Sequence, residues 1–508
     1  MKKIMLFVLA LCLCFTAIGA AFAETAAAGA TETETSAAEA PAEEAPKAEM
    51  TAEELYQAGS EAFDAKDYGK AMEYFLLAAD QGDGEAVFNI AVMYIRGYGV
   101  EQDYGKAFEY FQKAADLGDA TALNNLGFMY EEALGVEQDY ARALEYYRQA
   151  ADMDDAYGNA SLGDMYRCGK GVEQDLIKAA EYFKKALELG GDAPEILQDV
   201  DELAAALRKA GLDAFDAEDY GKAMEYYQLA ADLGNAEGWR GVGYLYQYGL
   251  GVEKSYDKAL EYYQLAADQG DTGAIVNIGS MYEDGLGVEQ DYGKALEYYQ
   301  KAADMGDTDI LGYIGYLYNM GLGAEQDYGK ALEYYQKAAD LGDATALINI
   351  GYMYEEGLGV EQDYSQAMKY FQQAADLGDV DALYNLGLMY FIGNGVEQDY
   401  GKACDYWQRA ADQGDPSALS GLGGCYYYGY GVEKDYAKAF EYYTLAAEKG
   451  DPAGLFGLGD CCYEGNGTEK DLDQAAEWYR KALDAGYEPD ETDQAHLKEV
   501  LGDEYQPK

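Results

Sequence analysis

Apolar residues along this chain recur at helical spacing inside a unit that repeats every 36 residues. In the copy from Asp327 to Gln362, DYGKALEYYQKAADLGDATALINIGYMYEEGLGVEQ, the residues Ala331, Tyr335 and Ala338 are separated by four and three positions. This spacing places the three side chains on one face of a helix and leaves polar residues on the other faces. The first half of the unit therefore predicts an amphipathic helix.

The second half of the same copy predicts another helix with its own apolar face. Its inward positions recur at steps of three and four residues, at Ala346, Leu347, Ile350, Gly351 and Tyr354. The glycine among them is small enough to let a neighbouring helix approach closely. Gly357 and Gly359 then end the helix. Each unit is thus predicted to be a pair of helices.

Residues at the predicted helix ends support these boundaries. Asp327 and Asp343 stand at N-cap positions, where a carboxylate accepts hydrogen bonds from the free backbone N–H groups of the first turn. Gly342 ends the first helix, since glycine readily adopts the left-handed conformation after a helix C-terminus. Glu333 precedes Lys337 by four residues, which is the favourable orientation for an ion pair on a helix.

The same pattern runs through most of the chain. The N-cap residue of the first helix returns in twelve copies, at Asp67, Asp103, Asp139, Asp175, Asp219, Ser255, Asp291, Asp327, Asp363, Asp399, Asp435 and Asp471. Neither helix of a pair can bury its apolar face alone, so the pairs must stack on one another to form a continuous core. We therefore predict an all-α protein in which the stacked array is the unit of stability.

The small and aromatic residues of the repeat resemble those of a known family. The pattern L-G-x-x-Y, then A-x-x-x-Y-x-x-A, with G-x-G-V-x-x-D-Y between the helices, is found at Ile350, Gly351 and Tyr354 and at Ala367, Phe371 and Ala374. It closely resembles the Sel1-like repeat, a relative of the tetratricopeptide repeat, over roughly residues 51 to 490. The resemblance implies an α/α solenoid, a right-handed superhelix of about twelve helical hairpins, that serves as an adaptor or scaffold for other proteins.

The N-terminus has the features of an export signal. Lys2 and Lys3 precede an apolar run from Ile4 to Ile18, and the run is followed by Ala21-Phe22-Ala23. We expect residues 1–23 to be a signal peptide cleaved after Ala23, and the mature protein to be secreted or periplasmic. Residues 24–50 are rich in Ala, Glu, Thr and Pro and are predicted to be a disordered linker. No later segment is apolar and long enough to predict a membrane span.

A change in the spacing of the repeats divides the rest of the chain into segments. The step from Asp175 to Asp219 is 44 residues instead of 36. We therefore predict an N-terminal array at 51–190, a connecting or capping helix at 191–212, a C-terminal array at 213–488, and a capping helix and tail at 489–508. The connecting segment is either a hinge between two arrays or a longer helix inside one continuous solenoid, and the sequence leaves both open.

The charge and the cysteine content indicate which partners and which covalent links are expected. With 95 acidic against 36 basic residues the net charge is −59, which disfavours nucleic acid and anionic lipid and favours solubility or basic partners. Five cysteines remain after signal cleavage, an odd number that predicts no disulfide framework. Cys168 is expected in a loop as a free thiol. Cys425 and Cys461 share a repeat position on helices too far apart for a disulfide.

Few residues suggest catalysis. His496 is the only histidine and is expected at the surface, which argues against a histidine-based nucleophile or metal site. The carboxylate pairs Glu131-Glu132 and Glu355-Glu356 leave a cell-envelope hydrolase as the alternative function, although they stand where solvated side chains are expected. We expect no cofactor and no metal site, and the sequence leaves calcium binding open.

Residues that vary between copies indicate a binding surface. In the resembling tetratricopeptide family, positions equivalent to these face the concave side and contact peptides. The predicted partner-binding residues are Asn277, Tyr316, Ile348, Asn349, Tyr352, Tyr384, Asn385, Leu388 and Phe391. Aromatic side chains are enriched at protein-binding hot spots. The leading hypothesis is therefore an exported, non-catalytic scaffold whose concave surface binds proteins or peptides that are basic or rich in apolar and aromatic residues.

Overall fold

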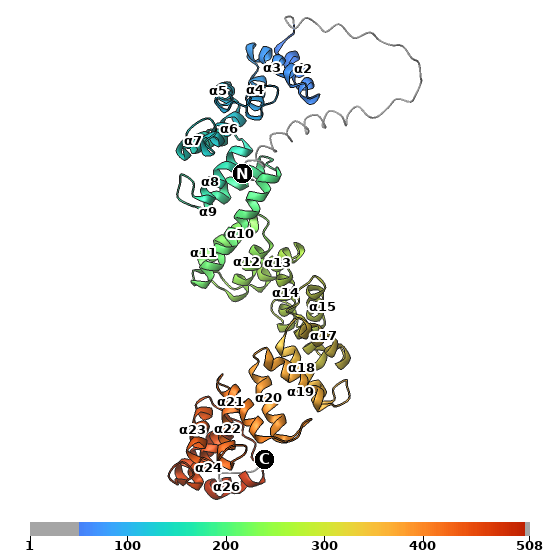
Figure 1. The fold of residues 1–508 in the computed structure, drawn as a ribbon, viewed down its shortest axis with the longest axis vertical. Coiled ribbons are helices and arrows are strands. Elements are labelled where there is room, and N and C mark those ends of the chain that lie inside the picture. Colours follow the sequence, from blue (N-terminus) through green and yellow to red (C-terminus); the bar gives the residue numbers. More distant parts are fainter. Residues whose placement is uncertain (1–49, 503–508) are drawn as a thin grey trace, which may run out of the picture. The chain divides into compact units, whose positions relative to one another are not determined.

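The computed structural model describes residues 50–502, over which the chain forms 25 helices, α2 to α26, and no strand (Figure 1). The predictions of a signal peptide, of the linker before residue 50 and of a tail after residue 502 lie outside these residues. Within 50–502, no helix is both long and apolar enough to cross a membrane. The helices form two compact units that divide between Asp271 and Thr272. The predicted all-α fold is confirmed.

The first unit contains twelve helices that follow the predicted rhythm. They are α2 (Ala52–Asp64), α3 (Tyr68–Asp80), α4 (Gly84–Arg96), α5 (Tyr104–Asp116), α6 (Ala120–Glu131), α7 (Tyr140–Asp152), α8 (Ala156–Cys168), α9 (Leu176–Glu188), α10 (Pro194–Asp216), α11 (Tyr220–Asp232), α12 (Ala236–Tyr248) and α13 (Tyr256–Asp268).

The second unit contains thirteen helices. They are α14 (Thr272–Asp284), α15 (Tyr292–Asp304), α16 (Leu311–Met320), α17 (Tyr328–Asp340), α18 (Ala344–Glu356), α19 (Tyr364–Asp376), α20 (Val380–Ile392), α21 (Tyr400–Ala411), α22 (Pro416–Tyr428), α23 (Tyr436–Glu448), α24 (Pro452–Glu464), α25 (Leu472–Asp484) and α26 (Glu491–Leu501). In each unit an even-numbered helix, here called an A helix, packs closely against the following odd-numbered helix, called a B helix.

The helix ends are stabilised as the sequence predicts. Asp327 accepts a hydrogen bond from the backbone N–H of Lys330 at 3.0 Å, and Asp343 caps α18 in the same way. Gly342, with φ +94°, adopts the left-handed conformation after α17. Lys337 pairs with Glu333 at 2.8 Å. All twelve predicted N-cap residues accept a hydrogen bond from the first turn of their B helix.

The core of each hairpin combines small residues of one helix with a large ring of the other. Ala331, Tyr335 and Ala338 are buried, as predicted for the inner face of α17. A methyl group on Gly351 of α18 would lie only 2.5 Å from the ring of Phe371 in α19. The predicted close approach is therefore confirmed, because any side chain at this glycine would occupy the space of the ring.

The A and B helices of a hairpin also contact each other through two stacked tyrosines. The sequence analysis did not identify this contact. Nine such pairs have ring centroids 5.6–5.8 Å apart and interplanar angles of 6–17°, for example Tyr390 with Tyr406. In most repeats a lysine of the B helix lies over the A-helix ring, as Lys402 does over Tyr390 at 4.9 Å. The hydroxyl of Tyr406 also donates to Gln372 of the preceding B helix at 2.8 Å, so successive repeats are linked.

The loop between the A and B helices is closed by a glutamine. Gln362 donates from its side-chain amide to the carbonyl of Glu355 at 2.7 Å and to the hydroxyl of Tyr364 at 3.0 Å. The glutamines of six other repeats donate to the corresponding carbonyl in the same way, at Gln102, Gln138, Gln174, Gln290, Gln326 and Gln398. The recurring Glu-Gln-Asp sequence thus has a structural role, because it satisfies a carbonyl of the last helical turn.

Three segments differ from their predicted form. The connecting helix continues to Asp216, because α10 combines the predicted segment with the A helix that pairs with α11. Cys168 is the last residue of α8 and not part of a loop, although it is exposed and unbridged as expected. His496 of the C-terminal helix α26 is partly buried instead of lying free at the surface, with its Nδ1 atom 3.1 Å from a carboxylate oxygen of Asp460.

The glycine-to-ring contact predicts opposite effects of alanine at two adjacent residues of α22. At Gly423 a methyl group would lie 2.5 Å from the ring of Tyr443, whereas at Gly424 it would meet only the Tyr443 hydroxyl at 3.6 Å. We expect Gly423→Ala to lower the free energy of unfolding by about 1–3 kcal/mol through overpacking. Gly424→Ala should be neutral, or stabilising by up to about 1 kcal/mol, because alanine favours a helix over glycine.

Urea unfolding followed by circular dichroism measures both variants against the unaltered chain. Since the two residues are neighbours in one helix, Gly424→Ala controls for helix propensity and local position. Equal stability of the two variants would contradict the packing role of the inward glycine.

Candidate functional site

The nine predicted binding residues all lie on A helices of the second unit. Asn277 is on α14, Tyr316 on α16, three are on α18 and four on α20. Polar contacts join these helices in pairs, because Tyr313 of α16 donates to Glu283 of α14, and Asn385 of α20 donates to the hydroxyl of Tyr352 on α18 at 2.8 Å. The structure therefore brings residues of successive repeats together along the row of A helices.

Two of the nine residues are buried. Ile348 packs in a core cluster with Leu347 and Phe371. Asn385 is buried beneath Tyr352, to which its amide donates. Both side chains therefore stabilise the contact between repeats, and neither is accessible to a partner in this conformation.

Three more of the nine are half-buried apolar groups that support the surface. Tyr384 stacks on Trp407 at 6.2 Å, and its carbonyl accepts a hydrogen bond from the Trp407 indole at 3.1 Å. Phe391 packs against Trp407 at 5.3 Å and against Tyr430 at 5.7 Å. Leu388 packs on the same core cluster. Each leaves part of its side chain accessible above this cluster.

The remaining predicted residues are the more accessible ones. Tyr316 and Tyr352 are each 40% exposed, which is unusual for a large ring on a folded helix. Tyr352 lies edge-on to Phe371 at 5.3 Å, and Tyr316 stacks on Tyr313 at 5.8 Å. Asn277 and Asn349 are half-buried. The exposed tyrosines are held in position from below, so they present rigid apolar surface.

The structure adds residues that the sequence analysis missed. Met320, Ile392 and Tyr428 end their A helices and are each more than half exposed. They follow the position of Tyr316 and Tyr352 by one helical turn, and other repeats have charged residues at the same place, such as Glu356. A comparison of the copies at the position one turn further along the A helix would have found these residues. We call Tyr316, Met320, Tyr352, Ile392 and Tyr428 the A-helix apolar row.

The first unit carries a smaller exposed aromatic pair at the same positions. Tyr244 and Tyr248 of α12 have ring centroids 4.5 Å apart, and both are exposed. Elsewhere in this unit the equivalent positions include charged residues, such as Asp164 and Glu132, the apolar residues Val92 and Phe128, and Leu212, which is also exposed. Exposed apolar side chains at these positions are therefore more numerous in the second unit.

Carboxylates lie near Tyr384 in the second unit. Burial raises the pKa of Tyr384, and the negative charges of Asp415 and Asp451 raise it further. Burial likewise raises the pKa of Asp381, with Asp379 and Asp415 adding to the effect. The carboxylates of Asp379, Asp381, Asp415 and Asp451 therefore make the surroundings of Tyr384 acidic. Such a surface attracts cations and repels anions.

Two arginines on A helices, Arg167 and Arg240, form ion pairs within the protein. Arg167 pairs with Asp164 of its own helix and with Asp199 and Glu202 of α10 at 3.1 and 2.7 Å. Burial disfavours the charged form of Asp164, but the charges of Arg167 and Lys170 and the hydrogen bonds to the carboxylate together outweigh it and lower the pKa of the carboxyl. Arg240 pairs with Asp271 at 3.3 Å. These arginines therefore do not form a clamp for an acidic peptide.

The carboxylate pairs of the alternative hypothesis occupy different environments. Glu131 is buried, accepts a hydrogen bond from the Tyr147 hydroxyl at 2.7 Å and pairs with Lys170 at 2.5 Å. Its neighbour Glu132 is exposed. Burial and then the charge of Glu356 raise the pKa of Glu355. Glu131 thus has a structural partner on each side, which leaves it poorly placed to exchange protons with a substrate.

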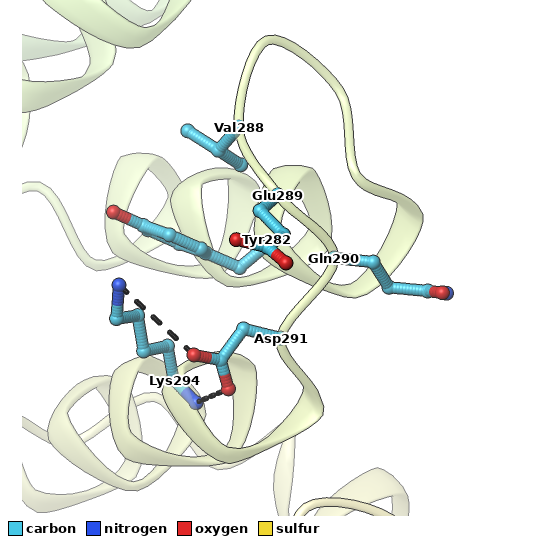
Figure 2. A pocket seen from close by; sticks show the side chains of 6 residues that line it. All are labelled: Tyr282, Val288, Glu289, Gln290, Asp291 and Lys294. Atoms are coloured by element: carbon cyan, nitrogen blue, oxygen red, sulfur yellow. Dashed lines mark hydrogen bonds and ion pairs between the residues drawn. The ribbon is translucent and has the colours of Figure 1, made fainter.

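A hollow of about 480 Å³ lies beside the loop between α14 and α15. It is lined by Tyr282, Val288, Glu289, Gln290, Asp291 and Lys294 (Figure 2). Lys294 lies 4.9 Å from the Tyr282 ring centroid and 4.0 Å from Asp291. Because this lysine is engaged with groups of its own repeat, and the same loop recurs along the chain, the hollow is a feature of the repeat.

Comparison with known proteins identifies the repeat. The family model described as Sel1 repeat matches twelve segments, at residues 50–83, 84–119, 120–155, 156–191, 210–235, 240–271, 273–307, 311–343, 344–379, 380–415, 416–451 and 452–487. No curated protein matches the sequence.

Two solved structures share the repeat. The structure of c5321, a protective antigen of uropathogenic Escherichia coli strains with an SLR fold, is 30% identical, covers 90% of this chain and 96% of its own, and has a TM-score of 0.52. A Sel1 repeat protein from Oxalobacter formigenes is 33% identical over 47% of this chain and 99% of its own, with a TM-score of 0.42. With twelve matched repeats that span most of its length, the chain belongs to the Sel1 repeat family.

Proposed function

We propose that this protein is an exported, non-catalytic scaffold that binds protein partners through the exposed apolar groups of its A helices. Sel1 repeats, like tetratricopeptide repeats, generally mediate protein–protein interactions. The observation that carries the proposal for this chain is the A-helix apolar row. Its members are accessible although the fold does not require large apolar groups there, since other repeats have charged residues at the same positions.

The partner surface suited to this row is apolar or aromatic at its centre and basic at its edge. Rigid aromatic side chains supply most of the binding energy at protein interfaces, while charges at the edge favour the correct partner and faster association. The carboxylates near Tyr384 and the large negative charge of the chain favour lysine and arginine in the partner. Nucleic acid, a polyanion, remains disfavoured on the same grounds.

Two observations support export. The first 23 residues have the composition of a cleavable signal, and we propose that the mature chain begins after Ala23 and is secreted or periplasmic. The c5321 structure, which covers 90% of this chain, is that of a protective antigen. A role outside the cytoplasm is consistent with both.

The proposed surface predicts position-dependent crosslinking. A photoreactive phenylalanine analogue at position 352 should capture a defined partner in the producing organism, because this side chain lies on the A-helix apolar row. The matched control is the same analogue at Leu341, which is 63% exposed but lies in the turn after α17. Equal capture from both positions would contradict a binding surface on the A helices.

With the partner purified, the double variant Tyr316→Ala, Tyr352→Ala tests the energetic contribution of the row. We expect affinity to fall by at least about thirtyfold, which corresponds to roughly 2 kcal/mol for aromatic hot-spot residues. Titration calorimetry measures the affinity, and circular dichroism checks that the variant is folded. Hydrolysis of an envelope glycan or peptide that is abolished by one carboxylate substitution would instead support the hydrolase alternative.

The acidic surface predicts that binding weakens with ionic strength. Raising salt from about 0.05 to about 0.3 M should lower the affinity for a basic partner several-fold, because added ions screen its attraction to the carboxylates. The same titration with Tyr352→Ala separates the two contributions, since this change removes an apolar group and no charge. Affinity that does not change with salt would show that the partner is not recognised through basic residues.

A further inference from the structure

Two buried cysteines lie in one core cluster where α21 packs on α22. Cys404 and Cys425 are 5% and 1% exposed and belong to one core cluster together with Trp407. The two thiols are close enough for each to shift the pKa of the other, and the thiol of Cys404 donates a hydrogen bond to the carbonyl oxygen of Tyr430 at 3.3 Å. Both cysteines are unbridged in the structure. They are therefore a contacting pair and not two isolated thiols.

The same two positions hold a pair of large apolar residues at other hairpin junctions. In each pair a B-helix residue packs in one cluster with a residue of the next A helix, 21 positions later in the chain. These pairs are Met72 with Met93, Phe108 with Met129, Leu144 with Met165, Met224 with Leu245, Leu296 with Leu317, Leu332 with Met353, and Met368 with Met389. At 404 and 425 alone, both members are cysteine.

The substitution of both members is informative because one cysteine alone would serve as a small apolar residue. That situation occurs at the next junction, where Cys461 packs with Phe440. Two cysteines in place of two large side chains reduce the volume of the core, and a cavity left there would be destabilising. Trp407, one turn after Cys404, is larger than the tyrosine or phenylalanine of other repeats, such as Phe371, and fills part of this space.

We propose that Cys404 and Cys425 are joined by a disulfide when the chain meets a disulfide oxidant such as oxidised glutathione. One thiolate attacks the oxidant disulfide, forms a mixed disulfide and releases one thiolate of the oxidant. The second cysteine then loses its proton and attacks the mixed disulfide, which forms the Cys404–Cys425 bond and releases the other thiolate. Two cysteine thiols are oxidised, and one disulfide is reduced to two thiols.

Either cysteine can attack the oxidant first, because the thiolate is the reactive form of cysteine and both thiols belong to the same cluster. The other cysteines of residues 50–502 lack this arrangement, since Cys168 is exposed at a helix end and Cys461 and Cys462 are adjacent in the chain.

The bond would reinforce the part of the solenoid beneath the exposed aromatic groups. Tyr430, whose carbonyl contacts Cys404, also packs on Phe391 and stacks with Tyr428 at 5.5 Å. A covalent link between α21 and α22 restricts the unfolded chain and thereby stabilises this junction. Oxidising compartments outside the cytoplasm are where such bonds persist.

Peptide mapping of the full chain tests the proposal. After refolding with reduced and oxidised glutathione, alkylation and trypsin digestion, ACDYWQR containing Cys404 should be recovered linked to the peptide from Ala410 to Lys434 containing Cys425. The intact mass should be lower by two hydrogen atoms, and reductant should restore both. The thermal midpoint of the oxidised chain should exceed that of the reduced chain.

The double variant Cys404→Leu, Cys425→Met is the matched control, because it restores the pair found at Leu332 and Met353. Its thermal midpoint should not respond to reductant. Recovery of both wild-type peptides singly alkylated after oxidation would overturn the proposal, as would a stable link of either cysteine to Cys461 or Cys462 instead. Because the readout is a covalent bond, the result is independent of whether a partner binds the A helices.

Discussion

The close contact between a glycine of the A helix and an aromatic ring of the B helix determines how eleven of the twelve described hairpins pack, and only α4 has an alanine, Ala91, at this position. At Gly351 the ring of Phe371 occupies the space that a side chain would need, and Gly387 has the same relation to Trp407. This contact brings the two helices together with little freedom, so the A helix presents the same outward face in every repeat. Residues on that face can then vary without loss of the fold, which separates the framework from the binding surface.

Electrostatics reinforce this separation. Lysines of the B helices lie over tyrosines of the A helices, as Lys330 does over Tyr318 at 4.7 Å, and arginines such as Arg167 are paired within the protein. Much of the limited positive charge thus serves the contacts inside the solenoid. Many other carboxylates, such as Glu132 and Glu356, are exposed, and the protein presents an acidic surface. Lysine and arginine residues of a partner can therefore pair with carboxylates that no basic residue of this protein neutralises.

The fold could be predicted from the sequence because the residues that form the helices, their ends and their core recur in each copy of the repeat. The N-caps and the burial of the ring at Tyr335 are local features that twelve copies repeat, and the ion pair of Glu333 with Lys337 is a local feature of its own copy. The binding residues were harder to predict, because exposure depends on the neighbouring repeat. Ile348 and Tyr352 are both large, variable residues of α18, yet Ile348 packs in the core and Tyr352 lies at the surface above Asn385. Variation between copies alone does not distinguish these two environments.

The same dependence on neighbours explains why the paired cysteines escaped the sequence analysis. Comparison of identical repeat positions relates Cys425 to Cys461, which lie on different A helices, whereas the contact that matters joins different positions on α21 and α22. In a stacked solenoid each residue contacts residues of its own hairpin and of the adjacent one. Two residues that react with each other can therefore occupy different positions of the repeat, and an alignment of the repeats does not compare such positions. A site in such a protein is therefore best sought among contacts in which both members depart from the repeat pattern together.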